Sequence, residues 1–132
     1  MKHDQDVATM AGKYACLALC YLKLYMLKTG TDANYSALQL LISHYDELIK
    51  QGAITNTFFV QDPAKLIKVV FNANVEITKS AFNDTGEFQI MNNGQHFVIG
   101  DDVGEIVWNS MDNDAAWKKI GLKDWRIMRI KQ

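Results

Sequence analysis

The fold is decided by the stretch Gly12–Lys28, which reads GKYACLALCYLKLYMLK. From Tyr14 to Leu27 its only charged residue is Lys23, and the others are Tyr, Ala, Cys, Leu and Met. A helix that is apolar around most of its circumference belongs inside a domain, because a surface helix has a polar face. The stretch therefore predicts one buried helix, against which the rest of the chain packs.

Cys16 falls in the first turn of this predicted helix, with the small residue Ala15 beside it. The first backbone N–H groups of a helix have no partner within the helix, and the helix dipole places partial positive charge at the same end. Both effects favour the thiolate, which is the reactive form of cysteine. Cys16 is therefore a candidate nucleophile that needs a base from elsewhere in the chain.

The length and composition indicate a single globular domain over residues 1–132. Hydrophobic residues make up 48% of the 132 residues, which is enough for a substantial core and too many for a disordered chain. The formal net charge is -1 at pH 7, so the chain lacks the broad positive field that binds nucleic acid. Nucleic acid is therefore not an expected partner, and the oligomeric state stays open.

The N-terminal sequence and the two cysteines bear on the cellular compartment. Residues 1–11 are a polar lead-in without the apolar run of a signal peptide. The buried helix is too short, and too interrupted by lysine, to cross a bilayer, so no membrane partner is expected. Cys16 and Cys20 lie four residues apart on one helix, where their Cβ vectors do not converge for a disulfide. Free thiols without an export signal favour a cytoplasmic location.

Predicted helices come first in the chain and predicted strands follow. After the buried helix, a second helix begins at Asn34 or Ser36 and ends near Gln51. A third, Pro63–Phe71, begins with Asp62 as its N-cap and Pro63 in its first turn. This order is typical of an α+β fold, with N-terminal helices packed on a C-terminal antiparallel sheet. The remaining predicted elements are strands at Val75–Thr78, Phe88–Met91, His96–Gly100, Glu105–Asn109 and Arg126–Ile130, and a helical turn at Asn113–Gly121.

Two of the predicted strands form a hairpin that brings a histidine next to an asparagine. If Gly100 pairs with Glu105 across the intervening turn, counting back along both strands places His96 opposite Asn109. Residues directly opposite each other share a face of the sheet. A slip of one residue would move every side chain to the other face. The same register puts four apolar residues on the second face: Phe97, Ile99, Ile106 and Trp108.

A carboxamide beside an imidazole fixes the direction of the ring. When the oxygen of Asn109 accepts a hydrogen bond from one ring nitrogen of His96, the other nitrogen is free to exchange a proton with a nucleophile. A cysteine at a helix terminus, a histidine on a strand and an asparagine on the next strand make a papain-type site. The sequence therefore predicts catalytic residues Cys16, His96 and Asn109, with no metal and no cofactor.

These residues resemble the papain-like superfamily of cysteine peptidases in its compact bacterial forms. Bacteriocin-processing peptidase domains of exporters show a similar helix-borne cysteine and a similar His-Phe-Val strand, and prophage-associated papain-like domains of about this length look closer still. The chain lacks a Cys-Gly-Ser-Cys-Trp block, and Ala15 stands where the compact families often have glycine. The matching blocks are Tyr14-Ala15-Cys16-Leu17-Ala18-Leu19, Gly94-Gln95-His96-Phe97-Val98-Ile99 and Ile106-Val107-Trp108-Asn109-Ser110.

The resemblance implies a phage-associated, papain-like hydrolase that cleaves a peptide or protein through a thioester. In such an enzyme Cys16 would be the nucleophile and His96 the base and acid. Asn109 would orient the ring of His96. The backbone N–H of Cys16 would supply one oxyanion donor, and Gln5 is the upstream candidate for the oxyanion-hole glutamine.

The residues also permit other interpretations. A free cysteine usually packs in the core, as Cys20 is expected to do, and a histidine at the start of a strand is often a surface residue. Asp112 competes with Asn109 as the orienting residue, and a zinc site at the two cysteines lacks the usual paired-ligand spacing. Besides a cysteine peptidase or amidase, the chain suits an inactive papain-like module that binds a host or phage protein, or an acyltransferase that uses the same thioester.

Overall fold

The computed structural model describes residues 2–31, 35–111 and 114–131 of the chain. Their order is that of an α+β fold, with helices first and an antiparallel sheet after them, as the sequence predicts. The elements are α1 (Lys2–Tyr14), α2 (Cys16–Thr29), α3 (Ala37–Ser43), α4 (Tyr45–Lys50), α5 (Pro63–Phe71), β1 (Asn74–Ser80), β2 (Gln89–Asn92), β3 (Phe97–Gly100), β4 (Ile106–Trp108), α6 (Asp114–Ile120) and β5 (Asp124–Lys131).

The buried helix α2 begins at Cys16 rather than at Gly12. The chain bends by 95° between Gln5–Gly12 and Cys16–Thr29, and the residues before the bend form α1. The prediction of a polar lead-in is therefore wrong. Val7 and Ala11 lie four residues apart and are buried, and Met10 packs beside them, so α1 places one apolar stripe on the core although polar residues outnumber apolar ones along it.

The predicted second helix is broken in two at His44. α3 ends at Ser43 and α4 starts at Tyr45, while Asn34, one of its two predicted caps, lies outside the described residues. The hydroxyl of Ser43 and Nδ1 of His44 both hydrogen-bond to the carbonyl of Leu40, at 3.1 and 2.9 Å. Side chains that bond to the carbonyls of the preceding turn bend helices, which explains the break. The third helix, α5, has the predicted bounds. Asp62 caps it, because its Oδ1 accepts a hydrogen bond from Lys65 N at 3.1 Å.

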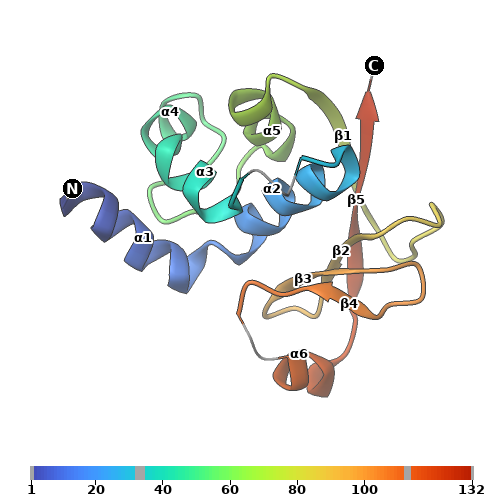
Figure 1. Cartoon of the computed structure of the whole chain (residues 1–132). Helices are drawn as coiled ribbons and strands as arrows, with labels where there is room; N and C mark the ends of the chain where they lie inside the picture. Colours follow the sequence, from blue (N-terminus) through green and yellow to red (C-terminus); the bar gives the residue numbers. More distant parts are fainter. Residues whose placement is uncertain (1, 32–34, 112–113, 132) are drawn as a thin grey trace.

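The five strands form one antiparallel sheet in the order β1-β5-β2-β3-β4. Alternate residues of β2 and β3 face opposite layers, because side chains alternate along a strand. Ile90 and Ile99 belong to the main core with α2, while Met91 and Val98 pack with Trp117 of α6. Figure 1 shows α6 apart from the other helices, beyond β3 and β4. The sheet therefore lies between the main helical layer and α6.

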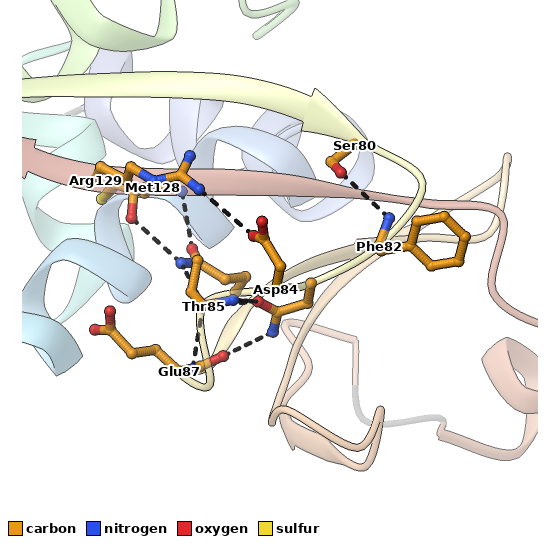
Figure 2. A network of polar contacts seen from close by, with 9 residues as sticks. Ser80, Phe82, Asp84, Thr85, Glu87, Met128 and Arg129 are labelled. Carbon is orange, nitrogen blue, oxygen red and sulfur yellow. Dashed lines mark hydrogen bonds and ion pairs between the residues drawn. The ribbon is translucent and has the colours of Figure 1, made fainter.

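Polar contacts hold the long connection from β1 to β2 and the start of β2, as Figure 2 shows. Gln89 is fully buried, and its amide exchanges two hydrogen bonds with the backbone of Met128, at 3.3 and 2.8 Å. Backbone pairing between β2 and β5 stops at Ile90, and these side-chain bonds take the place of the next inter-strand backbone hydrogen bonds. Thr85 lies beside them, and its hydroxyl donates to Asn83 Oδ1 at 2.7 Å.

The described residues include no single helix that is both long enough and apolar enough to cross a membrane. Among the described residues, Gln5–Gly12 of α1 and Cys16–Thr29 of α2 reach the length and apolar composition of a membrane span only when taken together, and the chain bends sharply between them. Seven residues of α2 are buried inside the protein, which accounts for its apolar composition.

Candidate functional site

The bend between α1 and α2 places Cys16 at the start of the central helix. Ala15 occupies the bend and is fully buried. Its N–H donates to Ala11 O at 3.1 Å and its carbonyl accepts from Leu19 N at 2.8 Å, so hydrogen bonding continues through the bend. The φ of Ala15 is -96°, which any L-residue adopts, so this position does not require glycine. Cys16 is partly exposed, whereas Cys20 is fully buried, as predicted.

A tight turn before β3 fixes the backbone of His96. Asn93 is only 5% exposed, and its Oδ1 accepts hydrogen bonds from Gln95 N at 2.9 Å and His96 N at 2.8 Å. Its Nδ2 donates to Trp117 O at 3.3 Å, and the indole of Trp117 donates to His96 O at 3.3 Å. The turn and α6 therefore hold the histidine from two sides.

His96 and Asn109 meet as the sequence predicts. Nε2 of His96 lies 2.7 Å from Oδ1 of Asn109. The same oxygen accepts from Met111 N at 3.0 Å, and Nδ2 of Asn109 donates to Oδ1 of Asp114 at 3.0 Å. A carboxylate only accepts hydrogen bonds, so the NH₂ group of the amide must face Asp114 and the oxygen must face the ring. Nε2 of His96 is then the protonated nitrogen, and Nδ1 is the one left for Cys16.

The strand register behind this contact differs from the predicted one. Gly100 pairs with Ile106 instead of Glu105, and Ile99 pairs with Trp108 instead of Ile106. Val107 is the extra residue of a bulge between these two pairs. The total slip beyond the bulge is two residues, which returns side chains to the predicted face, so the His96–Asn109 contact is kept. Ile106 lies before the bulge and packs with the α6 cluster, so its predicted place beside Ile99 is wrong.

Cys16 and His96 interact directly and shift each other's protonation. Burial is the largest single influence on Cys16 and opposes its ionisation. The hydrogen bond and charge of His96, together with backbone hydrogen bonds at Phe97 and Leu17, outweigh burial and hold the pKa of the thiol below its ordinary value. The hydrogen bond to Cys16 is the largest influence on His96 and, with that of Asn109, raises the pKa of the imidazole despite burial. Both shifts are in the direction that favours a thiolate–imidazolium pair.

Two cavities meet at Cys16. We call them the aromatic cavity, of about 420 Å³, and the tryptophan cavity, of about 280 Å³. Cys16 lines both, and His96 lines only the tryptophan cavity. The other residues are Tyr14, Leu17, Tyr21, Phe58, Phe59, Val60, Pro63, Phe97 and Arg126 in the aromatic cavity, and Asn93, Gln95, Met111, Ala116, Trp117 and Ile120 in the tryptophan cavity.

Gln5 does not join the site in the way that the resemblance implies. It is exposed on α1, nine residues before Tyr14, which is about 13 Å along a helix, and it lines neither cavity. Asp112, the rival orienting residue, lies outside the described residues. In the described part of the chain, no three His, Cys, Asp or Glu side chains form a group that holds a metal ion.

A family model described as "Protein of unknown function, DUF261" matches residues 1–130. The chain belongs to the DUF261 family. Comparison with curated proteins and with solved structures gives no match. The DUF261 match spans every element from α1 to β5, but its description names no activity. Family membership therefore gives this DUF261 protein no activity, and its site geometry is the guide to its function.

Three polar residues of this DUF261 site escaped the reasoning from sequence: Asn93, Gln95 and Asp114. Asn93 and Gln95 lie in the turn Asn92-Asn93-Gly94 and just before His96, so the turn motif was the signal for both. Asp114 lies five residues after Asn109, beyond a segment without a regular pattern, and no spacing rule connects the two. Its role follows only from the position of α6.

Proposed function

We propose that this protein is a cysteine hydrolase with a papain-like fold, which cleaves an amide bond of a peptide or protein. The observation that carries the proposal is the chain of contacts from Cys16 through His96 to Asn109. A partly exposed thiol with a lowered pKa, next to an imidazole that a carboxamide holds in place, is the arrangement of an activated nucleophile and its base. Both cavities beside Cys16 offer room for a substrate.

In the acylation step, the thiolate of Cys16 attacks the carbonyl carbon and forms a carbon–sulfur bond. Protonated His96 gives its proton to the amide nitrogen, so the carbon–nitrogen bond breaks and an amine leaves. The acyl group stays on Cys16 as a thioester. His96 is then neutral, with Nε2–H still donated to Asn109 and Nδ1 free to accept a proton.

In the deacylation step, water takes the place of the amine. Nδ1 of His96 accepts a proton from the water as its oxygen attacks the thioester carbonyl. The carbon–sulfur bond breaks, the carboxylic acid leaves, and the thiolate–imidazolium pair is restored. The backbone N–H groups at the start of α2 are available to donate to the developing oxyanion, because the first N–H groups of a helix lack acceptors within it.

The proposal is tested by alkylating Cys16 with iodoacetamide between pH 5 and pH 10 and locating the label by mass spectrometry. We expect rapid alkylation well below the ordinary thiol pKa of about 8.5. His96→Ala removes the partner that stabilises the thiolate, so its rate should fall about tenfold or more at pH 6. Cys16→Ser is the control that removes the label. A wild-type rate that follows an ordinary thiol, and that His96→Ala leaves unchanged, would overturn the proposal.

A catalytically inactive binding module is the second candidate, and the position of Gln5 favours it. A papain-type hydrolase uses a side-chain donor in addition to the backbone N–H of the nucleophile, and Gln5 lines neither cavity. Incubation with a peptide library separates the candidates, because a hydrolase releases new amino termini that Cys16→Ser does not release. Adding a second amine to the same reaction identifies an acyltransferase by its amide product.

A further inference from the structure

The two cavities beside Cys16 differ in their relation to the general acid. His96 lines the tryptophan cavity and is absent from the lining of the aromatic cavity. In the proposed reaction the imidazole must reach the nitrogen of the leaving amine in order to protonate it. The leaving group therefore lies on the side of the tryptophan cavity. The acyl part of the substrate, which stays bound to the sulfur, lies on the side of the aromatic cavity.

The aromatic cavity is lined by apolar groups that reach solvent at its rim. Tyr14 and Phe59 line the cavity and are 59% and 69% exposed, so both rings are open to a ligand at its rim. Phe58 is buried and Phe97 half-buried in the same lining. The cavity is large enough, at about 420 Å³, for an aromatic side chain.

The single charged residue among those that line the aromatic cavity already has partners within the protein. The guanidinium of Arg126 is bonded to the carboxylate of Asp124, stacks 5.5 Å from the ring centre of Phe97, and hydrogen-bonds to Tyr21. A charged substrate group would have to compete with these contacts. Apolar substrate groups gain from the exposed rings without such a cost.

We infer that the aromatic cavity binds a large apolar side chain, preferably aromatic, on the acyl part of the substrate next to the bond that is cleaved. The inference rests on the proposed function, because it uses His96 as the general acid to orient the substrate. It adds a substrate class, which is a peptide with an aromatic residue on the acyl side of the scissile bond.

The third cavity, of about 460 Å³, offers no comparable site. It lies near the network of Figure 2, between α2 and β5, and charged residues dominate its lining. Lys28 pairs with Glu87 at 3.2 Å and Arg129 with Asp84 at 3.5 Å, so its charges are matched within the protein. No cysteine or histidine of the described residues lines it.

The test compares three chloromethyl ketones that differ only in one side chain: N-acetyl-phenylalanyl, N-acetyl-glycyl and N-acetyl-aspartyl chloromethyl ketone. In each, the sulfur of Cys16 forms a bond to the methylene carbon and chloride leaves, and the variable side chain lies on the acyl side. We expect the phenylalanyl reagent to inactivate Cys16 at least about tenfold faster than the glycyl reagent, after correction for their rates with free cysteine. The aspartyl reagent should show no gain over the glycyl one.

Two matched variants locate the effect. Phe59→Ala removes an exposed ring from the rim and should lower the ratio of phenylalanyl to glycyl rates about threefold or more. Phe82→Ala removes a ring that is 78% exposed, between β1 and β2 and outside both cavities, and should leave the ratio unchanged. Met111→Ala, which trims the tryptophan cavity, should also leave it unchanged.

Each outcome of this test bears on the inference separately from the proposed function. A ratio near one, or a ratio that Met111→Ala lowers and Phe59→Ala does not, would overturn the inference while rapid iodoacetamide labelling still supported a hydrolase. Faster reaction with the aspartyl reagent would show instead that Arg126 accepts a carboxylate. Slow iodoacetamide labelling overturns the proposed function, whereas the ratio can still be measured on a slow thiol.

Discussion

The side-chain amide of Asn109 donates from Nδ2 to Oδ1 of Asp114, at 3.0 Å, and so turns its own oxygen toward Nε2 of His96. Asn109 alone fits its site in either of two amide orientations, and only one of them offers an acceptor to the ring. Asp114, at the first position of α6, selects that orientation together with the backbone N–H of Met111, which donates to the same oxygen. It is a positioning residue, because it acts on the thiol only through the amide and the ring.

Replacing Asp114 should therefore change the reactivity of Cys16. In Asp114→Ala we expect the iodoacetamide rate at pH 7 to fall about threefold to tenfold, which is the effect of losing one hydrogen bond that stabilises the charged pair. The pH profile of alkylation should also move toward higher pH, because a less firmly held imidazolium stabilises the thiolate less.

Two further variants distinguish positioning from a general loss of structure. Asp114→Asn keeps an oxygen that accepts from Asn109, so it should restore most of the rate. Asp102→Ala removes an exposed carboxylate from the turn between β3 and β4 and should leave the pH profile unchanged. Identical profiles for Asp114→Ala and the wild type would contradict a positioning role.

The two cysteines should behave differently although they lie one turn apart. Cys20 is fully buried, and its Sγ donates to Phe97 O at 3.4 Å. Burial, followed by the charge of Cys16, raises the pKa of the Cys20 thiol well above its ordinary value. We expect iodoacetamide at pH 7 to add one label to the native protein, at Cys16, and a second only after unfolding in urea. A native protein that takes up both labels at similar rates would contradict this arrangement, as would labelling of Cys20 first.

The sequence predicted the three catalytic candidates because each lies in a strong local pattern. Cys16 opens an apolar helix. His96 and Asn109 lie on the two strands of one hairpin, and counting along these strands from the turn relates them. The counting was wrong by two residues: Gly100 pairs with Ile106 rather than Glu105, which is a slip of one, and the bulge at Val107, which has no signature in the chain, adds the second. The contact of His96 with Asn109 survived because the strand period is two, so that a slip of two residues keeps every side chain on its face.

Other parts of the fold depend on contacts that no local pattern reveals. α1 is more polar than apolar, and its buried residues Val7 and Ala11 are too few to stand out from a polar segment. The break at His44 depends on two side chains that compete for one carbonyl, which an apolar repeat does not register. Asp114 enters the site only because α6 packs against the sheet through Trp117. Such tertiary placements override local preference.

The buried amide of Asn93 should matter for both stability and reactivity. Its Oδ1 and Nδ2 hold the backbone of Gln95, His96 and Trp117 through three hydrogen bonds. Asn93→Ala leaves these backbone groups without partners, so we expect a loss of about 2–4 kcal/mol in the free energy of unfolding. Urea unfolding measures this loss, with the exposed Asn74→Ala as a control that should change it by less than about 0.5 kcal/mol.

Reactivity separates the role of Asn93 from simple destabilisation. His96 loses a fixed backbone in Asn93→Ala, so the alkylation rate of Cys16 should fall at pH 6 even where the variant is fully folded. A fully folded variant with the wild-type rate would show that the turn contributes only to stability.

The shifted pKa values of Cys16 and His96 make stability depend on pH in opposite directions. The pKa of His96 is raised, so its contribution is complete below the unfolded value of about 6.5 and is lost as the pH rises through the folded value. The pKa of Cys16 is lowered, so its contribution is complete above the unfolded value of about 8.5 and is lost as the pH falls through the folded value. At pH values where both contributions to the free energy of unfolding change, their opposite dependences on pH cancel.

The difference in unfolding free energy between the wild type and Cys16→Ser should therefore rise with pH where Cys16 titrates, between its lowered folded pKa and about 8.5, and fall with pH where His96 titrates, between about 6.5 and its raised folded pKa. Cys16→Ser is a suitable reference because it removes the thiolate and also returns the pKa of His96 toward its ordinary value. Urea unfolding at unit steps of pH measures the difference. A steady rise with pH would mean that Cys16 ionises without a charged partner, and a difference independent of pH would mean that the thiol and the imidazole are not coupled, since a coupled pair must exchange protons at both ends of the range.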